Sequence, residues 1–192
     1  MLTLSTRNQI AIGIALVALM AATRGHHFPT VKQLLPSASL AVFFLAGVYL
    51  RPAWVLAVLL GGAAFLDYAA ISWGGVSSFC VSPAYVALIP AYGALWFAGR
   101  WYAGRYSFKP ITLLTLAGSA FVGMLACELI SSGSFYFFSG RFTDPTLLEF
   151  ATRFAKYFPS SLASIGFWVA VAALTHAIVV TLWHNNARPR LT

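Results

Sequence analysis

Long apolar runs separated by short polar breaks make up most of the sequence. An apolar run of about 20 residues is long enough to cross a bilayer as a helix. We expect six such spans, of which the second is short, at 6–23, 37–50, 53–72, 84–99, 110–130 and 160–183. Because the runs are continuous and do not alternate, the pattern predicts helices and excludes a transmembrane barrel. The prediction is an all-α integral membrane bundle of six transmembrane helices, forming a single domain over residues 1–192.

The breaks between the spans differ in character. Arg7 followed by an apolar run resembles a secretory signal, but further spans follow, so we expect this first helix to be retained. The connection 131–159 is the longest, and its Gly- and Ser-containing first part, 132–140, is predicted to be flexible. Its second part, 145–158, has the pattern of a short amphipathic helix, separate from the last span.

Composition supports a membrane protein, because only 8% of the residues are charged, against about 25% in a soluble domain. The net charge of +8 comes from basic residues at the ends of apolar runs. That placement indicates contact with lipid headgroups in the bilayer, and it excludes nucleic acid as a partner. With the N-terminus inside, inner segments contain seven Lys and Arg residues and outer segments five, three of them in the long last connection. Both termini are therefore predicted to be cytoplasmic.

The candidate chemistry gathers at the predicted outer side. Two of the four acidic residues, Asp67 and Glu128, lie within spans. A carboxylate at the centre of a membrane helix costs roughly 2.5–3.5 kcal/mol, so it marks either a ligand site or a paired carboxylate. The polar break Gly74–Tyr85 contains Cys80, one of only two cysteines. An outer pocket is predicted from these residues together with His26, His27, Tyr85, Tyr136 and Arg153.

Cys80 has several interpretations. It could form a disulfide with Cys127, remain an unused thiol, or bind a metal as a thiolate. One cysteine cannot build a closed zinc site, but it can supply an axial bond to a metal already held by a macrocycle. His26 or His27 could join it as a ligand, or serve as the base of an intramembrane Cys/His hydrolase. The segment Ser132-Gly133-Ser134 lacks the Gly-x-Ser-x-Gly elbow of serine hydrolases.

The chain resembles a transporter family over its whole length. Six short spans and the small-residue ridge Ala11-x-x-x-Ala15 resemble the S-components, the substrate-binding membrane subunits of energy-coupling-factor (ECF) vitamin transporters. The match is narrower to the BtuM-type cobalamin S-components. It rests on Asp67, the loop Ser77-Ser-Phe-Cys80-Val-Ser-Pro83, Tyr85 and Arg153.

This resemblance implies cobalamin uptake across the inner membrane of a Gram-negative bacterium. Cys80 would be the axial cobalt ligand and could assist removal of the upper ligand, as in decyanation. Asp67, Tyr85 and Arg153 would line the pocket and hydrogen-bond the amides of the corrin. His27, Phe28 and Tyr136 are further candidates for contact with it. An ECF energising module would dock on Ala11 and Ala15, and because the chain has no Walker A sequence, ATP would be used by that partner. The alternatives are an S-component for another vitamin, the hydrolase, and a purely structural membrane protein.

Overall fold

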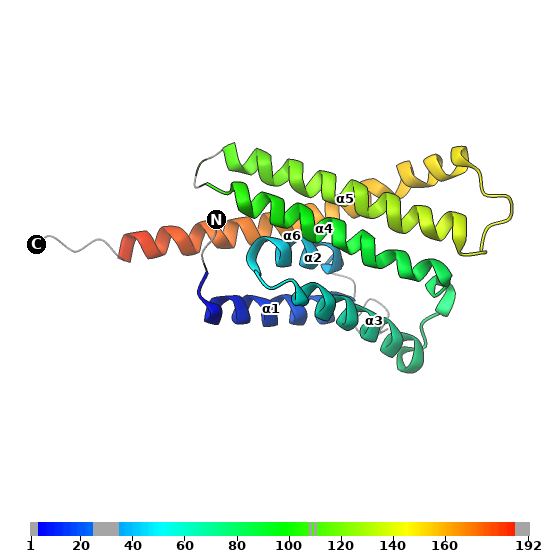
Figure 1. The fold of residues 1–192 in the computed structure, drawn as a ribbon, viewed down its shortest axis with the longest axis horizontal. Helices are drawn as coiled ribbons and strands as arrows, with labels where there is room; N and C mark the ends of the chain where they lie inside the picture. Colours follow the sequence, from blue (N-terminus) through cyan, green and yellow to red (C-terminus); the bar gives the residue numbers. More distant parts are fainter. Residues whose placement is uncertain (1–3, 25–34, 108, 110, 187–192) are drawn as a thin grey trace, which may run out of the picture.

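The protein is an all-α bundle in which consecutive helices run in opposite directions (Figure 1). The computed structural model describes residues 4–24, 35–107, 109 and 111–186. These residues form six α-helices and two short 3-10 helices. They are α1 (Thr6–Arg24), α2 (Ser39–Tyr49), α3 (Trp54–Gly74), η2 (Ser78–Cys80), η3 (Pro83–Ala87), α4 (Leu88–Arg105), α5 (Ile111–Phe138) and α6 (Leu147–Asn186).

The alternating directions give the bundle two chemically different ends (Figure 1). The terminal end contains the start of α1, the end of α6, and the α2–α3 and α4–α5 connections. The distal end contains the α3–α4 and α5–α6 connections. Residues predicted to lie on one side of a membrane, such as Arg51 and Arg105, are therefore at one end of the molecule, and Arg24 and Arg153 are at the other.

Within the described chain, four helices are long and apolar enough to cross a membrane: α1, α3, α5 and α6. The structure thus supports four of the six predicted spans by length and apolarity. α2 has 11 residues and is therefore about 16 Å long, roughly half the thickness of the hydrocarbon core. α4 has 18 residues but includes Arg100 and Arg105.

α2 is the centre of the core. Every residue from Ala41 to Ala46 is at most 5% exposed, and α2 packs closely along α4. Glycines permit this approach, because a Cβ on Gly47 would meet the Trp96 carbonyl and a Cβ on Gly99 would meet the Phe44 carbonyl. Small residues at helix contacts are typical of membrane bundles, where close packing replaces the hydrophobic effect. The four long helices contribute exposed apolar side chains to the exterior of the bundle, including Ile14, Phe65, Leu114 and Leu174.

The connection between the last two helices is shorter than the sequence indicated. The predicted flexible segment 132–140 is wrong for the most part, because α5 continues as a helix to Phe138. Ser132 donates a hydrogen bond to Glu128 one turn earlier, at 2.7 Å. The rings of Tyr136 and Phe137 pack against Phe150 of α6, with centroids 5.8 and 5.5 Å apart. Tertiary packing thus outweighs the weak helix propensity of Gly and Ser.

The predicted amphipathic segment 145–158 is helical, but it is not separate from the last span. It forms the first turns of α6, which continues through Pro159. A proline inside a helix removes one backbone hydrogen bond. Here neighbouring segments hold the helix on both sides of the proline. Phe158 packs against Phe121 of α5, with ring centroids 6.0 Å apart, and beyond the proline Ser164 and Trp168 donate to the carbonyls of Ser37 and Pro36.

The small-residue ridge of α1 faces outward. Ala11 and Ala15 are both exposed, whereas Leu16 and Met20, on another face of the same helix, are at most 7% exposed. The alternative that this ridge serves packing within the bundle is therefore wrong.

Candidate functional site

A cavity of about 720 Å³ lies at the distal end, and all six α-helices contribute to its wall. Its lining combines many apolar and aromatic side chains with a few polar groups, as is typical of small-molecule sites. The residues predicted from the sequence to form a pocket and placed in this wall are Asp67, Tyr85, Glu128, Tyr136 and Arg153.

Asp67 is the most heavily bonded polar group in this wall. Its carboxylate receives two hydrogen bonds from Arg24, Nε to Oδ1 and Nη2 to Oδ2, both at 2.7 Å. The Tyr85 hydroxyl donates to Oδ2, also at 2.7 Å. The bidentate geometry fixes the guanidinium and carboxylate planes relative to each other. Asp67 is thus a paired carboxylate and a cavity-lining residue at once, so the two alternatives for this residue do not exclude each other.

The loop that contains Cys80 begins where α3 ends. Gly75 closes α3 in the left-handed conformation, with φ of 68°, and its N–H donates to the Ala70 carbonyl. Glycine adopts this conformation without a Cβ penalty. The chain then turns back through η2, whose last residue is Cys80. The description covers the backbone of Cys80 but not its side chain.

Residues on both sides of Cys80 line the cavity, among them Ser77 and Val81. The preceding residue, Phe79, anchors the loop on the other wall. Its ring packs edge-on against Phe135 of α5 with centroids 5.8 Å apart. The Arg141 guanidinium lies 5.1 Å from the centre of the same ring. This segment of the loop is therefore held at the rim of the cavity, against the α5–α6 connection.

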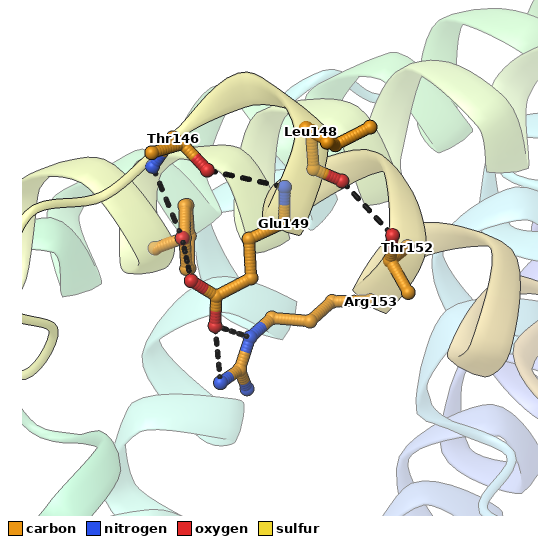
Figure 2. Close-up of polar contacts among 6 residues, drawn as sticks. Thr146, Leu148, Glu149, Thr152 and Arg153 are labelled. Carbon is orange, nitrogen blue, oxygen red and sulfur yellow. Dashed lines mark hydrogen bonds and ion pairs between the residues drawn. The ribbon is translucent and has the colours of Figure 1, made fainter.

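Arg153 is held by neighbours on α5 and α6. Figure 2 shows its side chain and that of Glu149 extending toward each other from one turn of α6, where Arg153 Nε and Nη2 donate to Glu149 Oε1 at 3.0 and 2.8 Å. The Tyr136 hydroxyl donates to the other carboxylate oxygen at 2.9 Å. The guanidinium also lies over the ring of Phe142, 4.8 Å from its centre. These contacts restrict the rotamers of Arg153 and direct it to the cavity wall.

Charge is balanced within the cavity. The described charged residues that line it are two cations, Arg24 and Arg153, and two carboxylates, Asp67 and Glu128. Aromatic side chains supply much of the remaining wall, including Phe135, Tyr136, Phe142, Phe150, Phe154 and Tyr157. Such a surface fits a large ligand with many uncharged polar groups better than a polyanion.

Several predicted residues are not placed by the structure or have other roles. His26, His27 and Phe28 lie outside the described residues, so their predicted roles stay predictions. Cys127 is a free thiol, 1% exposed, in the core. The alternative of a disulfide with Cys80 is therefore wrong, and the ordinary role of Cys127 as a buried apolar residue is confirmed. Among the described side chains, no three His, Cys, Asp or Glu groups gather to hold a metal ion.

Sequence reasoning missed two partners in this site. One is Arg24, which pairs with Asp67. The available signal was a cation ending one span near a carboxylate of another. The other is Glu149, which lies in the predicted amphipathic segment, and its spacing of four residues from Arg153 is that of a helical ion pair.

No protein-family model matches the chain, and no curated protein matches it.

Proposed function

We propose that this protein is a BtuM-type cobalamin S-component, which takes up cobalamin through the distal cavity. One observation supports the proposal most directly. The segments on both sides of Cys80 line the same cavity as Asp67, Tyr85 and Arg153, the residues on which the resemblance rests. These residues are up to 86 positions apart in the sequence (153 − 67), so their presence in one wall is not a consequence of sequence proximity.

The polarity of the cavity supports this substrate. Its volume of about 720 Å³ lies within the range of small-molecule sites, so a whole cobalamin would extend beyond it. A corrin carries amide groups around an apolar macrocycle. The aromatic wall would contact the macrocycle, and the polar groups of Tyr85, Arg153 and Asp67 would bind the amides.

In this proposal, the Cys80 thiolate takes an axial position on the cobalt of the substrate. A coordinating thiol loses its proton, and the resulting thiolate sulfur donates electron density to the metal. Donation from sulfur weakens the ligand on the opposite face of the corrin. Exchange of an upper ligand such as cyanide, which would leave as the anion with its bonding electron pair while water takes its place, would then be an activity that accompanies transport.

Inward release requires an energised partner. The exposed ridge at Ala11 and Ala15 offers a flat surface for a helix of an ECF energising module, since small residues permit close helix approach. The cavity lies at the end of the bundle opposite the start of α1 and the end of α6. With both termini cytoplasmic, as the distribution of Lys and Arg predicts, it would open to the outer side.

The decisive experiment is the visible absorption spectrum of the purified protein after incubation with cobalamin. The wild type is expected to retain a corrin with a shifted absorption band. Cys80→Ala is expected to lose the thiolate-type band. The matched control is Cys127→Ala, which removes the other thiol of the chain from a site in the core of the bundle and should keep the band.

Each alternative function predicts a different result. A protein that retains no corrin in any variant would disprove the cobalamin proposal and favour another vitamin or a structural role. An unshifted corrin bound equally by wild type and Cys80→Ala would leave transport standing but remove the axial ligand. Covalent labelling of Cys80 by substrate-like electrophiles, lost in a His27→Ala variant, would favour the hydrolase.

A further inference from the structure

A second cavity, of about 270 Å³, lies at the terminal end between α2, α4, α5 and α6. It is separate from the distal cavity, and the two share no lining residue. Along α6 its wall extends from Val169 to Ala177, which corresponds to about 12 Å of helix. The space is therefore elongated along the bundle, and nothing in the proposed transport function uses it.

The second cavity changes in polarity along its length. Its deep part is apolar, with Leu45, Leu116 and Val169 in the wall. Its mouth is polar and is formed by the α4–α5 connection, where Ser107, Lys109 and Thr112 line it. The rings of Tyr106 and His176 also line the cavity. The Tyr106 hydroxyl and His176 Nε2 are hydrogen-bonded at 3.0 Å.

Hydrogen bonds join the described residues of the mouth to one another. The Lys109 N–H donates to the Ser107 carbonyl at 2.8 Å, and the Thr112 N–H donates to the Lys109 carbonyl at 3.0 Å. The Thr112 hydroxyl donates to the Ser107 carbonyl at 2.6 Å. Lys109 thus lies at the opening of an apolar space.

The wall also reaches the outer surface of the bundle. Leu113 lines the cavity and still has 61% of its surface exposed. The exposed side chains of neighbouring turns, Leu114 and Ile178, are apolar as well. A ligand can therefore enter from the side that faces hydrocarbon.

The terminal end has an excess of positive charge that the protein does not neutralise. Arg51, Arg100, Arg105 and Lys109 lie there. The chain has only four acidic residues. Asp67 and Glu128 line the distal cavity, and Asp144 and Glu149 belong to the α5–α6 connection and the first turn of α6. The counter-charge for the terminal end must therefore come from outside the chain.

We infer that the second cavity binds an anionic phospholipid, with an acyl chain in the apolar part and the headgroup phosphate on Lys109. An amphiphile matches the change from apolar depth to cationic mouth. Basic pockets between membrane helices are known to bind acidic headgroups. Aromatic residues such as Tyr49 and Tyr102 in the same wall are typical of the level at which headgroups lie. This inference is independent of the cobalamin proposal.

The test is a lipid titration of the delipidated full-length protein in detergent. Dioleoylphosphatidylglycerol is added in one series, and dioleoylphosphatidylcholine, with identical acyl chains, in another. Inorganic phosphate is the third series. The melting temperature is followed in each, since a ligand that binds the folded state raises it, and native mass spectrometry counts the retained lipids. Phosphatidylglycerol alone is expected to raise the melting temperature and to be retained as a bound lipid.

Three variants locate the site. Lys109→Gln is expected to weaken phosphatidylglycerol binding about fivefold, the effect of one Lys near an anionic surface. Ala173→Leu fills the cavity, leaves every charge in place, and should abolish retention. Lys156→Gln, which removes a lysine from the first half of α6 on the opposite side of Pro159, is the matched control and should bind like the wild type.

The inference is overturned if phosphatidylcholine stabilises the protein equally, because the charge of the headgroup would then be irrelevant. It is also overturned if inorganic phosphate reproduces the effect without an acyl chain. Unchanged binding in both Lys109→Gln and Ala173→Leu would show that the lipid binds elsewhere.

Discussion

At the scale of single residues, the distal cavity depends on pairs of opposite charge. The Arg24 and Asp67 side chains retain exposures of only 13% and 22%, whereas those of Arg153 and Glu149 retain 43% and 49%. An exposed ion pair contributes little to stability because water and salt screen it. A buried ion pair matters more to stability, because removing one partner leaves the other as a buried charge without a counter-charge. The first pair is therefore expected to support the fold, and the second to orient Arg153.

Removing the charge of Asp67 should destabilise the protein. Asp67→Asn leaves the Arg24 guanidinium without a counter-charge and is expected to lower the free energy of unfolding by about 1–3 kcal/mol. The measurement is reversible denaturation in detergent, with Arg24→Gln and the double variant alongside. The double variant should cost less than the sum of the two single changes, by about 0.5–3 kcal/mol. Strict additivity would show that the pair contributes nothing to stability.

Glu149 is expected to affect ligand binding without affecting stability. Glu149→Gln weakens the hold on Arg153 in an exposed part of α6, so the melting temperature should stay the same within error. If the cobalamin proposal holds, corrin affinity should fall, and spectroscopic titration would measure the decrease. The control is Thr152→Ala, at the position just before Arg153. The Thr152 hydroxyl donates to the Leu148 carbonyl of its own helix. A drop in melting temperature equal to that of Asp67→Asn would contradict the assignment of an orienting role.

At the scale of elements, the helix pair α2 and α4 organises the bundle. Neither helix has the length and apolarity of a membrane span. α2 is almost entirely buried, whereas α4 is buried on one face and exposes Phe97 and Trp101 on another. Their axes can approach because Gly47 and Gly99 each face a carbonyl of the other helix. Phe43 stacks on Tyr92 beside this contact, with ring centroids 4.3 Å apart. A side chain added at the contact must push the two helices apart.

A pair of glycine substitutions in α4 tests this close contact. Gly99→Ala should destabilise the protein by about 1–3 kcal/mol, because the new methyl group overpacks the contact with the Phe44 carbonyl. Gly104→Ala places the same methyl group where no atom lies within 4 Å. It should be neutral or stabilising by up to about 1 kcal/mol, since alanine favours the helix. Both values come from the same denaturation assay, and equal effects would contradict the proposed role of Gly99.

At the scale of the whole molecule, the alternating helix directions give the two ends of the bundle different charge. The distal end pairs its cations with the few carboxylates of the chain, around a cavity of about 720 Å³. The terminal end has basic residues and no acidic side chain from anywhere in the sequence to neutralise them. This difference predicts one orientation in a bilayer, with the basic end at the cytoplasmic face.

Cysteine labelling in intact cells should report that orientation. In a Cys80→Ser background, Thr143→Cys in the α5–α6 connection is expected to react with a membrane-impermeant thiol reagent. Ser5→Cys, just before α1, should react only after the membrane is permeabilised. Both side chains are exposed, so accessibility to the reagent is limited by sidedness alone. The reverse pattern would place the large cavity on the cytoplasmic side and exclude uptake by the proposed route.

The sequence by itself determined the all-α class, the membrane environment and the approximate position of each long helix. Run length and apolarity are local properties, so they can be recognised without knowledge of the fold. It also placed Asp67, Tyr85, Tyr136 and Arg153 at one end of the bundle, because successive spans must alternate in direction. The roles of Cys80 and His27 remain predictions from the sequence.

The tertiary structure decided what depends on the rotation and packing of helices. The pairing of Arg24 with Asp67 joins residues 43 positions apart, and it requires a particular rotation of α1 against α3. Whether α2 faces lipid or protein, and whether α5 continues beyond Ser132, depends on neighbours that no local pattern specifies. Packing energies of the aromatic contacts between α5 and α6 exceed the small differences in helix propensity. The extent of those two helices, and with it the wall of the large cavity, was therefore settled only by the folded bundle.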